Sequence, residues 1–523
     1  MSAVAGPRYD AIVVGGGHNG LTCATYLARG GRRVLVLEAA ERLGGAAATR
    51  EFAPGFSVSA CAHLLHLMPA ALLDELTLER HGLKLAATRL PTVALAQDSA
   101  HLSLGPGSLA ALAARSAADA ARLAEWQAML GRFARALHPV LTQTPPRLGS
   151  DSWRDTYGLL GLGWRLRRLG RRDLRELLRI GGMCVHDVLE ERFALPLLKG
   201  ALALDAVLGT NYGPRSPGTM LSLLYRLAAS RGADSLALPA GGLGALSEAL
   251  ARAARAAGAE IRLAAPVARI VVRDDHVVGV VLASGEEVAA ASVVSSADPR
   301  STFLGLLGGE HLDAGFARRV SKLRSRGLTA KLHLALERLP AFTGLDAAQL
   351  NGRLLVAPST DYIERAYNHA KYNEYSTAPM LEITLPTLAD PGLAPAGKHV
   401  MSVIVQYAPY ALAGGWDGQR QAFSEVIIET LASFAPRLRE CIVATELLTP
   451  ADIEREFRIS GGHWHHAELA LDQFLMVRPL PGAAQYRTPV PGLFLCGAGC
   501  HPGGGVMGLP GRNAARAMMR EAA

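Results

Sequence analysis

The feature that most constrains this chain is a glycine-rich turn near its start. Gly15, Gly17 and Gly20 form a GxGxxG pattern directly after an apolar run. Glycines at these positions permit a tight turn, a close approach of backbone to a pyrophosphate and close helix–strand packing. The helix expected from His18 onward directs its unpaired N–H groups to that pyrophosphate, and Glu38 closes the next apolar run, where an acid can bind a ribose. The pattern predicts a βαβ unit that binds an adenine dinucleotide.

A second pair of glycines indicates which dinucleotide is bound. Gly44 and Gly45 follow the acidic strand end and give the backbone a second place to lie against a cofactor. In order and spacing, the turn, the acid and the Gly-Gly pair resemble the fingerprint of FAD-dependent oxidoreductases, the family that includes amine oxidases and carotenoid desaturases. The runs 16–20, 44–49 and 54–56 are most similar to its phytoene desaturase-related branch.

The resemblance implies an α/β fold, with a Rossmann-like FAD-binding domain of the amine oxidase/phytoene desaturase type and an interleaved α+β substrate domain. The FAD-binding domain is expected to combine residues 1–75, 235–300 and 485–523. The substrate domain is expected to combine residues 76–234, which show helical periodicity, with residues 301–484. The sequence also predicts helices over 109–141, 245–257 and 421–434, and strands over 267–273, 277–282, 289–296, 329–336, 380–384, 400–406 and 491–498.

The resemblance further implies that FAD is bound noncovalently. The segment near Val267 is expected to meet the adenine, and the Gly497 region the pyrophosphate and ribityl chain. Amides near Met507 and Gly508 are expected at the flavin ring. The full set of expected cofactor contacts is Gly15, Gly16, Gly17, His18, Asn19, Gly20, Glu38, Arg42, Gly44, Gly45, Ala46, Val267, Gly497, Ala498, Val506, Met507 and Gly508.

Two positions depart from the wider family. Ala46 stands where amine oxidases and many carotenoid desaturases have Arg after the glycine pair, and Ala40 replaces another Arg. Arg42 is the residue that can compensate. Neither Cys496 nor Cys500 is expected to link the flavin covalently. No aromatic cage or covalent flavin attachment motif can be recognised, which weakens the amine oxidase alternative.

Histidines are the candidate groups for chemistry beyond the flavin itself. His501 follows the last apolar run and could hold a proton or orient a substrate. The alternative, that it shapes the turn by bonding to backbone, stays open. His463 and His466 are candidate pocket residues, and His465 and His466 are expected on opposite faces of a strand. No metal is expected, because no nearby cysteine or carboxylate completes a ligand set.

Three further polar residues favour structural roles. His63 and His66 are spaced to share one helix face, and a satisfied structural histidine is the preferred interpretation. Glu382 alternates with apolar residues in a predicted strand. A solvent-facing or ion-paired carboxylate is expected there rather than a catalytic one.

Composition limits the remaining possibilities. Half of the 523 residues are hydrophobic and 19% are charged, as in a globular protein. No apolar run reaches the ~18 residues of a membrane span, and the first strand begins too early for a signal peptide. A cytoplasmic location is therefore expected. The six scattered cysteines include no closely spaced redox pair near residues 40–50, which argues against disulfide reductase chemistry.

The net charge of +8 is locally concentrated in the Arg-rich stretch 164–179. One interpretation is a basic amphipathic surface that rests on an anionic membrane. The favoured interpretation is a solvated helical face with Asp173 and Glu176 as partners. No motif supports nucleic-acid binding, and the sequence leaves the oligomeric state open.

The resemblance implies desaturation, saturation or isomerisation of a C–C bond in an apolar, carotenoid- or lipid-like small molecule. A flavin amine or amino-acid oxidase is one alternative. A flavin-bound structural or interaction protein without turnover is another. The sequence does not identify the substrate, the electron acceptor or a catalytic base.

Overall fold

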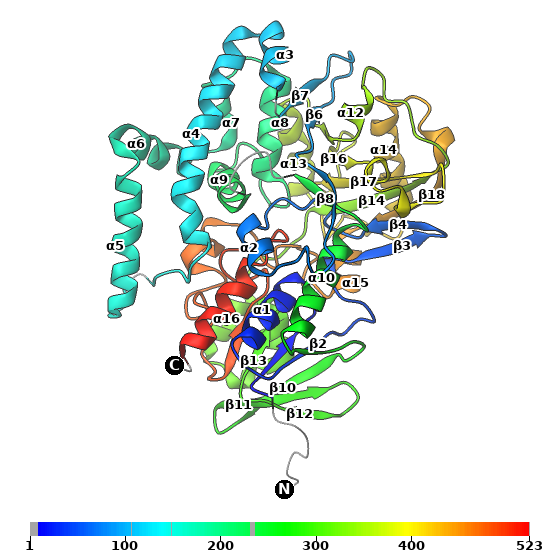
Figure 1. Ribbon diagram of the computed structural model, residues 1–523. Coiled ribbons are helices and arrows are strands. Elements are labelled where there is room, and N and C mark those ends of the chain that lie inside the picture. The colour runs from blue at the N-terminus through cyan, green and yellow to red at the C-terminus, as the bar shows by residue number, and fades with distance from the viewer. Residues whose placement is uncertain (1–8, 106, 148, 231–235, 522–523) are drawn as a thin grey trace.

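The computed structural model describes residues 9–105, 107–147, 149–230 and 236–521. Its two largest sheets lie in the lower and the upper half of Figure 1, and a group of helices lies beside the upper one. The boundary expected at residue 234 falls in a stretch outside the described residues. Among the described residues, no helix combines the length and the hydrophobicity needed to cross a bilayer.

The lower sheet is parallel, and its five strands come from three distant parts of the chain. In spatial order they are β19 (Leu493–Leu495), β13 (Val293–Ser295), β1 (Ala11–Val14), β2 (Val34–Leu37) and β9 (Glu260–Arg262). Every residue of β1 and β2 is buried, as expected for a parallel sheet covered on both faces. Adjacent elements are α1 (His18–Arg29), α10 (Leu243–Ala256), α16 (Leu509–Glu521) and the antiparallel strands β10 (Val267–Arg273), β11 (His276–Leu282) and β12 (Glu287–Ala289).

The upper sheet has seven strands and joins residues before and after the middle of the chain. Its order is β18 (Ile442–Leu448), β14 (Thr329–Leu336), β17 (His399–Gln406), β16 (Met380–Thr384), β15 (Arg353–Val356), β6 (Thr92–Ala94) and β7 (Leu102–Leu104). Only the β15–β6 pair is parallel. The central strand β14 is buried along its whole length.

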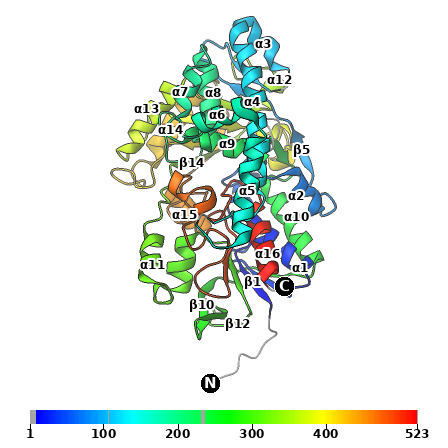
Figure 2. The same cartoon turned by 90° about the vertical axis from the view of Figure 1, so that its left-hand side faces the viewer.

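Seven helices stand beside the upper sheet. They are α3 (Ser108–Arg115), α4 (Ala117–Leu141), α5 (Trp153–Arg167), α6 (Gly170–Gly181), α7 (Val185–Glu190), α8 (Pro196–Val207) and α9 (Thr219–Ser230). Helices α5 and α6 project from the left edge of Figure 1, and Figure 2 views the molecule from that side. The other elements with at least four residues are α2 (Ala70–Glu75), β3 (Thr49–Ala53), β4 (Phe56–Ser59), β5 (Leu85–Thr88), the π-helix Ser301–Leu307, α11 (Ala314–Ser321), α12 (Ala347–Leu350), α13 (Thr360–Lys371), α14 (Arg420–Ala432) and α15 (Pro450–Phe457).

Most predicted elements are confirmed, and two that the sequence predicts as single elements are divided. The helix expected over 109–141 is interrupted at Ser116, whose side chain accepts a hydrogen bond from the backbone N–H of Asp119 and starts a new helix. The strand expected over 289–296 is split, because β12 pairs with β11 whereas β13 pairs with β1. The chain changes sheets between them.

Candidate functional site

The first glycine turn has the geometry that its sequence predicts. Gly15 has a φ of +100°, and α1 begins directly after Gly17. A Cβ on Gly20 would lie 2.1 Å from the carbonyl oxygen of Gly15, so no other residue fits without moving the turn. The N–H of Gly16 donates to Oε2 of Glu38 at 2.6 Å, which ties the turn to the acid at the end of β2. His18 and Asn19 form the first turn of α1.

The second glycine pair lies directly against the first. Gly17 and Gly44 form a parallel bridge, and the N–H of Gly44 donates to the carbonyl oxygen of Gly16 at 3.0 Å. A Cβ on Gly17 would meet only the Gly44 carbonyl at 4.0 Å, and one on Gly45 would meet only Gly17 at 3.9 Å. Ala46 packs in a small apolar cluster nearby. The first glycine turn and the Gly44-Gly45 pair leave backbone open to a ligand at Gly17 and Gly45.

Two further segments complete this region. The Glu38 carbonyl accepts from the N–H of Ala265 at 2.9 Å, which brings the start of β10, and with it Val267, beside the acid. A Cβ on Gly497 would lie 2.3 Å from the carbonyl oxygen of Ser296, the residue that also borders Gly15. Gly497 and its neighbour Ala498 therefore lie near the first glycine turn.

The C-terminal glycine-rich turn packs against α1. A Cβ on Gly508 would meet Oγ1 of Thr22 at 3.1 Å, Val506 has a positive φ of +50°, and Met507 is fully buried. Expected cofactor residues from three distant segments are thus brought together. Arg42 is exposed.

Buried polar atoms in this region lack partners within the described residues. They are Nε2 of His18, Oδ1 of Asn19, Oγ of Ser247 and Nδ1 of His466. An unsatisfied buried polar atom costs about 1–3 kcal/mol, so a cluster of them indicates a polar ligand. Burial and the neighbouring His466 lower the pKa of His18 to about 4, so this imidazole is neutral. The glycine surfaces and these atoms fit a dinucleotide.

His501 has the geometry of a structural histidine. Its Nδ1 lies 3.0 Å from the carbonyl oxygen of Leu475 and its Nε2 lies 2.8 Å from that of Val140. The side chain is fully buried, and burial lowers its pKa. Both ring nitrogens face backbone, which favours the turn-shaping alternative over a catalytic role.

The histidine stretch 463–466 forms a tight turn, so the prediction of a strand is wrong. The N–H of His466 donates to the carbonyl of His463 at 2.7 Å, and His466 has a φ of +61°. Nδ1 of His463 accepts from the N–H of His465, and burial lowers the pKa of His463 to about 3. Within the described residues no group of metal-ligating side chains is found.

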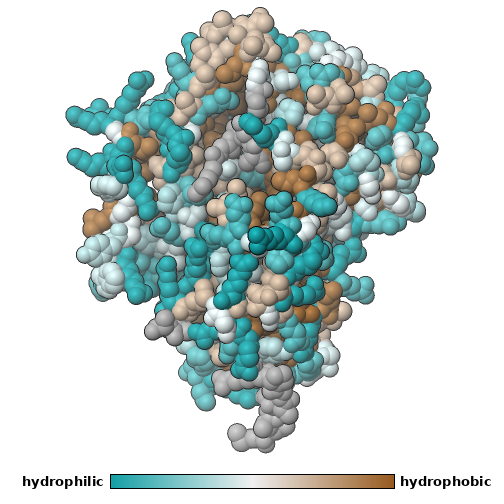
Figure 3. Space-filling model, in the orientation of Figure 1, coloured by the Kyte–Doolittle hydropathy of each residue, from teal (hydrophilic) through white to brown (hydrophobic). Residues whose placement is uncertain are grey.

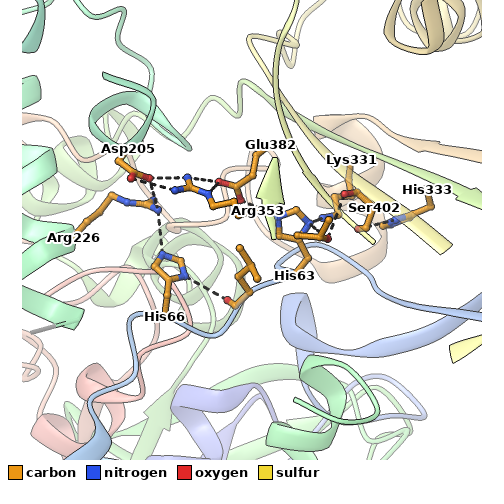
Figure 4. A network of polar contacts seen from close by, with 11 residues as sticks. His63, His66, Asp205, Arg226, Lys331, His333, Arg353, Glu382 and Ser402 are labelled. Atoms are coloured by element: carbon orange, nitrogen blue, oxygen red, sulfur yellow. Dashed lines mark hydrogen bonds and ion pairs between the residues drawn. The ribbon is translucent and has the colours of Figure 1, made fainter. Parts of the chain in front are cut away.

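A buried charge network lies between the upper sheet and the helices (Figure 4). It consists of His63, His66, Asp205, Arg226, Lys331, Arg353 and Glu382. Most of these residues lie among apolar neighbours in the sequence, so no motif marks them as a group. A charged residue inside an apolar strand or helix is the signal that could have found them.

The first part of the network connects β14 to β16. Nζ of Lys331 donates to Nδ1 of His63 at 2.7 Å, and Nε2 of His63 donates to Oε1 of Glu382 at 2.8 Å. Burial lowers the pKa of Lys331 to about 7 and that of His63 to about 4. His63 is therefore neutral, with its proton on Nε2 in this arrangement.

The second part reaches the helices. Arg353 donates to Glu382 at 2.5 Å and to Asp205 at 2.7 Å. Nη2 of Arg226 donates to Asp205 at 3.3 Å and to Nε2 of His66 at 3.1 Å. Burial opposes ionisation of Asp205, yet the two guanidinium groups outweigh it and hold its pKa below the usual value. Burial and Arg226 lower the pKa of His66 to about 3.

His63 and His66 do not lie on a helix, and Glu382 is more buried than its sequence predicts. The prediction that His63 and His66 share a helix face is wrong, because this segment is not helical and the N–H of Leu65 pairs with Ala237 at 2.9 Å. Glu382 is confirmed as an ion-paired carboxylate in a strand, and it is buried rather than solvent-facing.

A cavity of about 660 Å³ opens onto one end of this network. Its walls come from α3, α4, α8 and α9 and are predominantly apolar, with Leu123, Trp126 and Leu130 from α4. Its polar lining includes His66, Asp205, Arg226 and Arg353. A larger open groove of about 1360 Å³ is lined by none of the residues assigned to the cofactor cleft or to the network.

The polar end of the cavity adjoins the C-terminal glycine-rich turn of the cofactor region. Tyr225, next to Arg226 on α9, donates its hydroxyl to the carbonyl of Gly504 at 2.8 Å. A Cβ on Gly505 would lie 2.3 Å from Cδ1 of Leu67, the residue after His66. The cavity and the cofactor region therefore share a wall.

Comparisons with known proteins agree with this arrangement. The family model described as flavin containing amine oxidoreductase matches residues 20–519. The chain is 36% identical to pyridine nucleotide-disulfide oxidoreductase domain-containing protein 2 of Rattus norvegicus, over 98% of this chain and 94% of the rat protein. It is 27% identical to a limonene dehydrogenase chain of Castellaniella defragrans, over 98% of this chain and 94% of that protein. The crystal structure of an oxidoreductase from Methanosarcina mazei matches with a TM-score of 0.60 and 18% identity, over 98% of this chain and 99% of that chain.

The family match and the cleft lead to the same cofactor. The match spans nearly the whole chain, and the residues at the cleft offer glycine backbone, an acid at the end of β2 and unpartnered polar atoms to a dinucleotide. The chain belongs to the flavin-containing amine oxidoreductase family and is an FAD-dependent oxidoreductase of its phytoene desaturase-related type.

Proposed function

We propose that this enzyme dehydrogenates, saturates or isomerises a C–C bond in an apolar, carotenoid- or lipid-like molecule. The cavity of about 660 Å³ carries the proposal, because its apolar walls suit a hydrocarbon body and it adjoins the C-terminal glycine-rich turn. Its volume lies within the roughly 300–1,000 Å³ typical of small-molecule sites. The name of the relative from Castellaniella defragrans, a limonene dehydrogenase, supports the same class of substrate.

Bound FAD supplies the acceptor or donor for hydride. The chain's own groups bind and orient the reactants. The glycine turns at Gly17 and Gly44 would hold the dinucleotide, and Tyr225 fixes the turn at Gly504 beside the cavity. The leucine and tryptophan walls exclude water from the reacting carbons.

The proposal is tested by anaerobic mixing of the oxidised holoenzyme with apolar donors such as monoterpenes, isoprenoid alcohols and carotenes. Bleaching of the flavin absorbance with a product two hydrogens poorer supports dehydrogenation. For saturation the photoreduced enzyme is mixed with polyenes, and for isomerisation products of unchanged mass are separated by chromatography. If no apolar molecule reacts in any of the three assays, the proposal is wrong.

A cavity-filling variant links any activity to this site. Gly131 lines the cavity, and a Cβ there would meet only Nη1 of Arg135 at 3.5 Å. Gly131→Leu is expected to lower the rate of flavin reduction by about tenfold, since the added side chain occupies substrate space. Gly163→Leu is the matched control, because a Cβ at this helical glycine meets nothing within 4 Å. Equal rates in the two variants would place the reaction elsewhere.

The amine oxidase alternative is tested in the same assay with primary and secondary amines. A cationic amine is disfavoured at the polar end of the cavity, because Arg226 and Arg353 already occupy Asp205. Flavin reduction by amines alone would favour that alternative. A flavin that no donor reduces would favour the non-enzymatic one.

A further inference from the structure

The polar end of the cavity has a specific charge arrangement. Arg226 and Arg353 face Asp205, and Arg353 also pairs with Glu382. Two guanidinium groups are thus matched by two carboxylates. The charges at this end are already compensated before any ligand enters.

Some polar surface at this end remains accessible to a ligand. Asp205 keeps 33% of its side-chain surface and Arg226 keeps 16%, and both residues line the cavity. His66 lines it as well, with Nε2 occupied by Arg226. A hydroxyl can donate to Asp205 and accept from Arg226, and a carbonyl oxygen can accept from Arg226.

A charged group fits this end less well. A carboxylate would stand beside Asp205 and compete with it for Arg226 and Arg353. An ammonium would stand beside two guanidinium groups and compete with them for Asp205. Because Asp205 and Arg226 are only partly exposed, such an uncompensated charge is disfavoured.

We infer that this cavity takes an amphiphile with one uncharged polar group, a hydroxyl or a ketone carbonyl, bound between Asp205 and Arg226 with its apolar body along α4. The inference rests on the proposed function, because it names the polar group of that substrate class. A pure hydrocarbon would leave the accessible oxygen of Asp205 without a ligand partner and is expected to bind more weakly.

Four ligands with the same triene body test the inference: farnesol, farnesoic acid, farnesylamine and the hydrocarbon 2,6,10-trimethyldodeca-2,6,10-triene. Binding to the oxidised holoenzyme is measured by calorimetry at pH 7.5, below the solubility limit and any critical micelle concentration of each ligand. Farnesol is expected to bind at least about tenfold more tightly than each of the other three. Acid or amine binding as tight as that of farnesol would overturn the inference.

Charge changes in the protein provide a second test. Asp205→Asn gives the polar end a net positive charge and is expected to shift the preference from farnesol towards farnesoic acid by about tenfold. Asp361→Asn makes the same change in an exposed pair with Arg215 and is expected to shift nothing. An unchanged preference in Asp205→Asn overturns the inference. If the variant does not fold, the comparison of ligands in the unmodified protein still decides.

The two failures are distinguishable. Tight, selective binding of farnesol without reduction of the flavin by any apolar donor would overturn the proposed function and leave the binding inference standing. Reduction of the flavin by apolar donors, together with equal binding of ligands that differ in head group, would support the proposed function and overturn the binding inference.

Helix α5 carries a stripe of exposed apolar side chains. Trp153, Tyr157, Leu160 and Trp164 lie on one side of this helix and are 66%, 67%, 63% and 60% exposed. They recur at intervals of three and four residues, which places them in one stripe. The helix lies at the edge of the molecule, where Figure 3 shows apolar patches among projecting hydrophilic side chains.

Arginines continue this surface along α6. Arg167, Arg168, Arg171, Arg172 and Arg175 are exposed. The nearby acids are engaged on the inner side: Asp173 pairs with Arg132, and Glu176 with Arg179 and Arg192. The expected acidic partners are therefore present but do not neutralise the outer arginines. An aromatic stripe beside surplus arginine matches the chemistry of an anionic membrane surface.

We propose that the α5–α6 surface rests on a bilayer containing anionic lipid. Co-sedimentation with phosphatidylglycerol/phosphatidylcholine vesicles is expected to exceed that with phosphatidylcholine vesicles by at least about tenfold at low salt. Trp153→Ser with Trp164→Ser is expected to abolish the difference, whereas Tyr372→Ser, at an exposed aromatic residue outside this surface, is expected to preserve it. Equal binding to both vesicles overturns the proposal. A dimer in ultracentrifugation that the double variant dissociates, without vesicle binding, would make this surface a self-interface instead.

Discussion

Gly20 shows how strictly single residues control the cofactor turn. A Cβ at this position would lie 2.1 Å from the Gly15 carbonyl oxygen, a contact that backbone cannot relieve locally. Gly20→Ala is expected to lower the flavin content of the purified protein by at least about tenfold, because the turn must open to admit the methyl group. The ratio of flavin to protein absorbance measures this. Gly161→Ala, where a Cβ meets nothing within 4 Å, is expected to retain full flavin.

Lys331 is expected to make stability depend on pH. Burial lowers its pKa from 10.5 to about 7 in the folded chain. Between these two pH values the unfolded chain binds more protons at Lys331 than the folded chain does. The contribution of Lys331 to the free energy of unfolding therefore rises with pH. The slope is at most about 1.4 kcal/mol per pH unit. From pH 7.5 to pH 8.5 the free energy of unfolding, measured in urea, is expected to increase more for the unmodified protein than for Lys331→Met. Equal gains would mean that Lys331 titrates normally.

At the scale of elements, Asp119 connects two walls of the cavity. Its carboxylate in the first turn of α4 accepts from the N–H groups of Ala194 and Leu195 at 3.0 and 2.8 Å, just before α8. Asp119→Ala is expected to lower the free energy of unfolding by about 2 kcal/mol, because these N–H groups lose their charged acceptor. Ser116→Ala, which removes only the helix cap, is expected to cost about 1 kcal/mol. Urea unfolding of both variants compares them, and equal losses would contradict the bridging role.

The elements also show what the sequence could and could not predict. Strands β14 and β16 have the bounds that the sequence predicts, because local pattern and burial agree there. The helix predicted for His63 and His66 does not form, because the backbone of this segment bonds to residues far away in sequence. The glycine motifs could be located because they require particular backbone geometry. The charge network could not, because its members become neighbours only in the folded chain.

At the scale of the molecule, the residues expected to hold FAD come from three distant segments that meet in the fold. A ligand that binds only the folded chain stabilises it, by about 2.7 kcal/mol at a concentration 100 times its dissociation constant. Removal of FAD is expected to lower the thermal midpoint and to speed proteolysis in the C-terminal segment that carries β19 and α16. Limited proteolysis of the apoprotein and holoprotein checks this. Equal cleavage rates would mean that the segments assemble independently of the cofactor.

The position of β19 has a consequence for biosynthesis. This strand pairs with β13 at one edge of the parallel sheet, and the glycine turn that follows it packs against α1. A ribosome has produced the first glycine turn and its acid hundreds of residues before it produces these last pieces. The nascent chain therefore lacks these pieces for most of its synthesis, and we expect firm loading of FAD only after the C-terminal segment has left the ribosome.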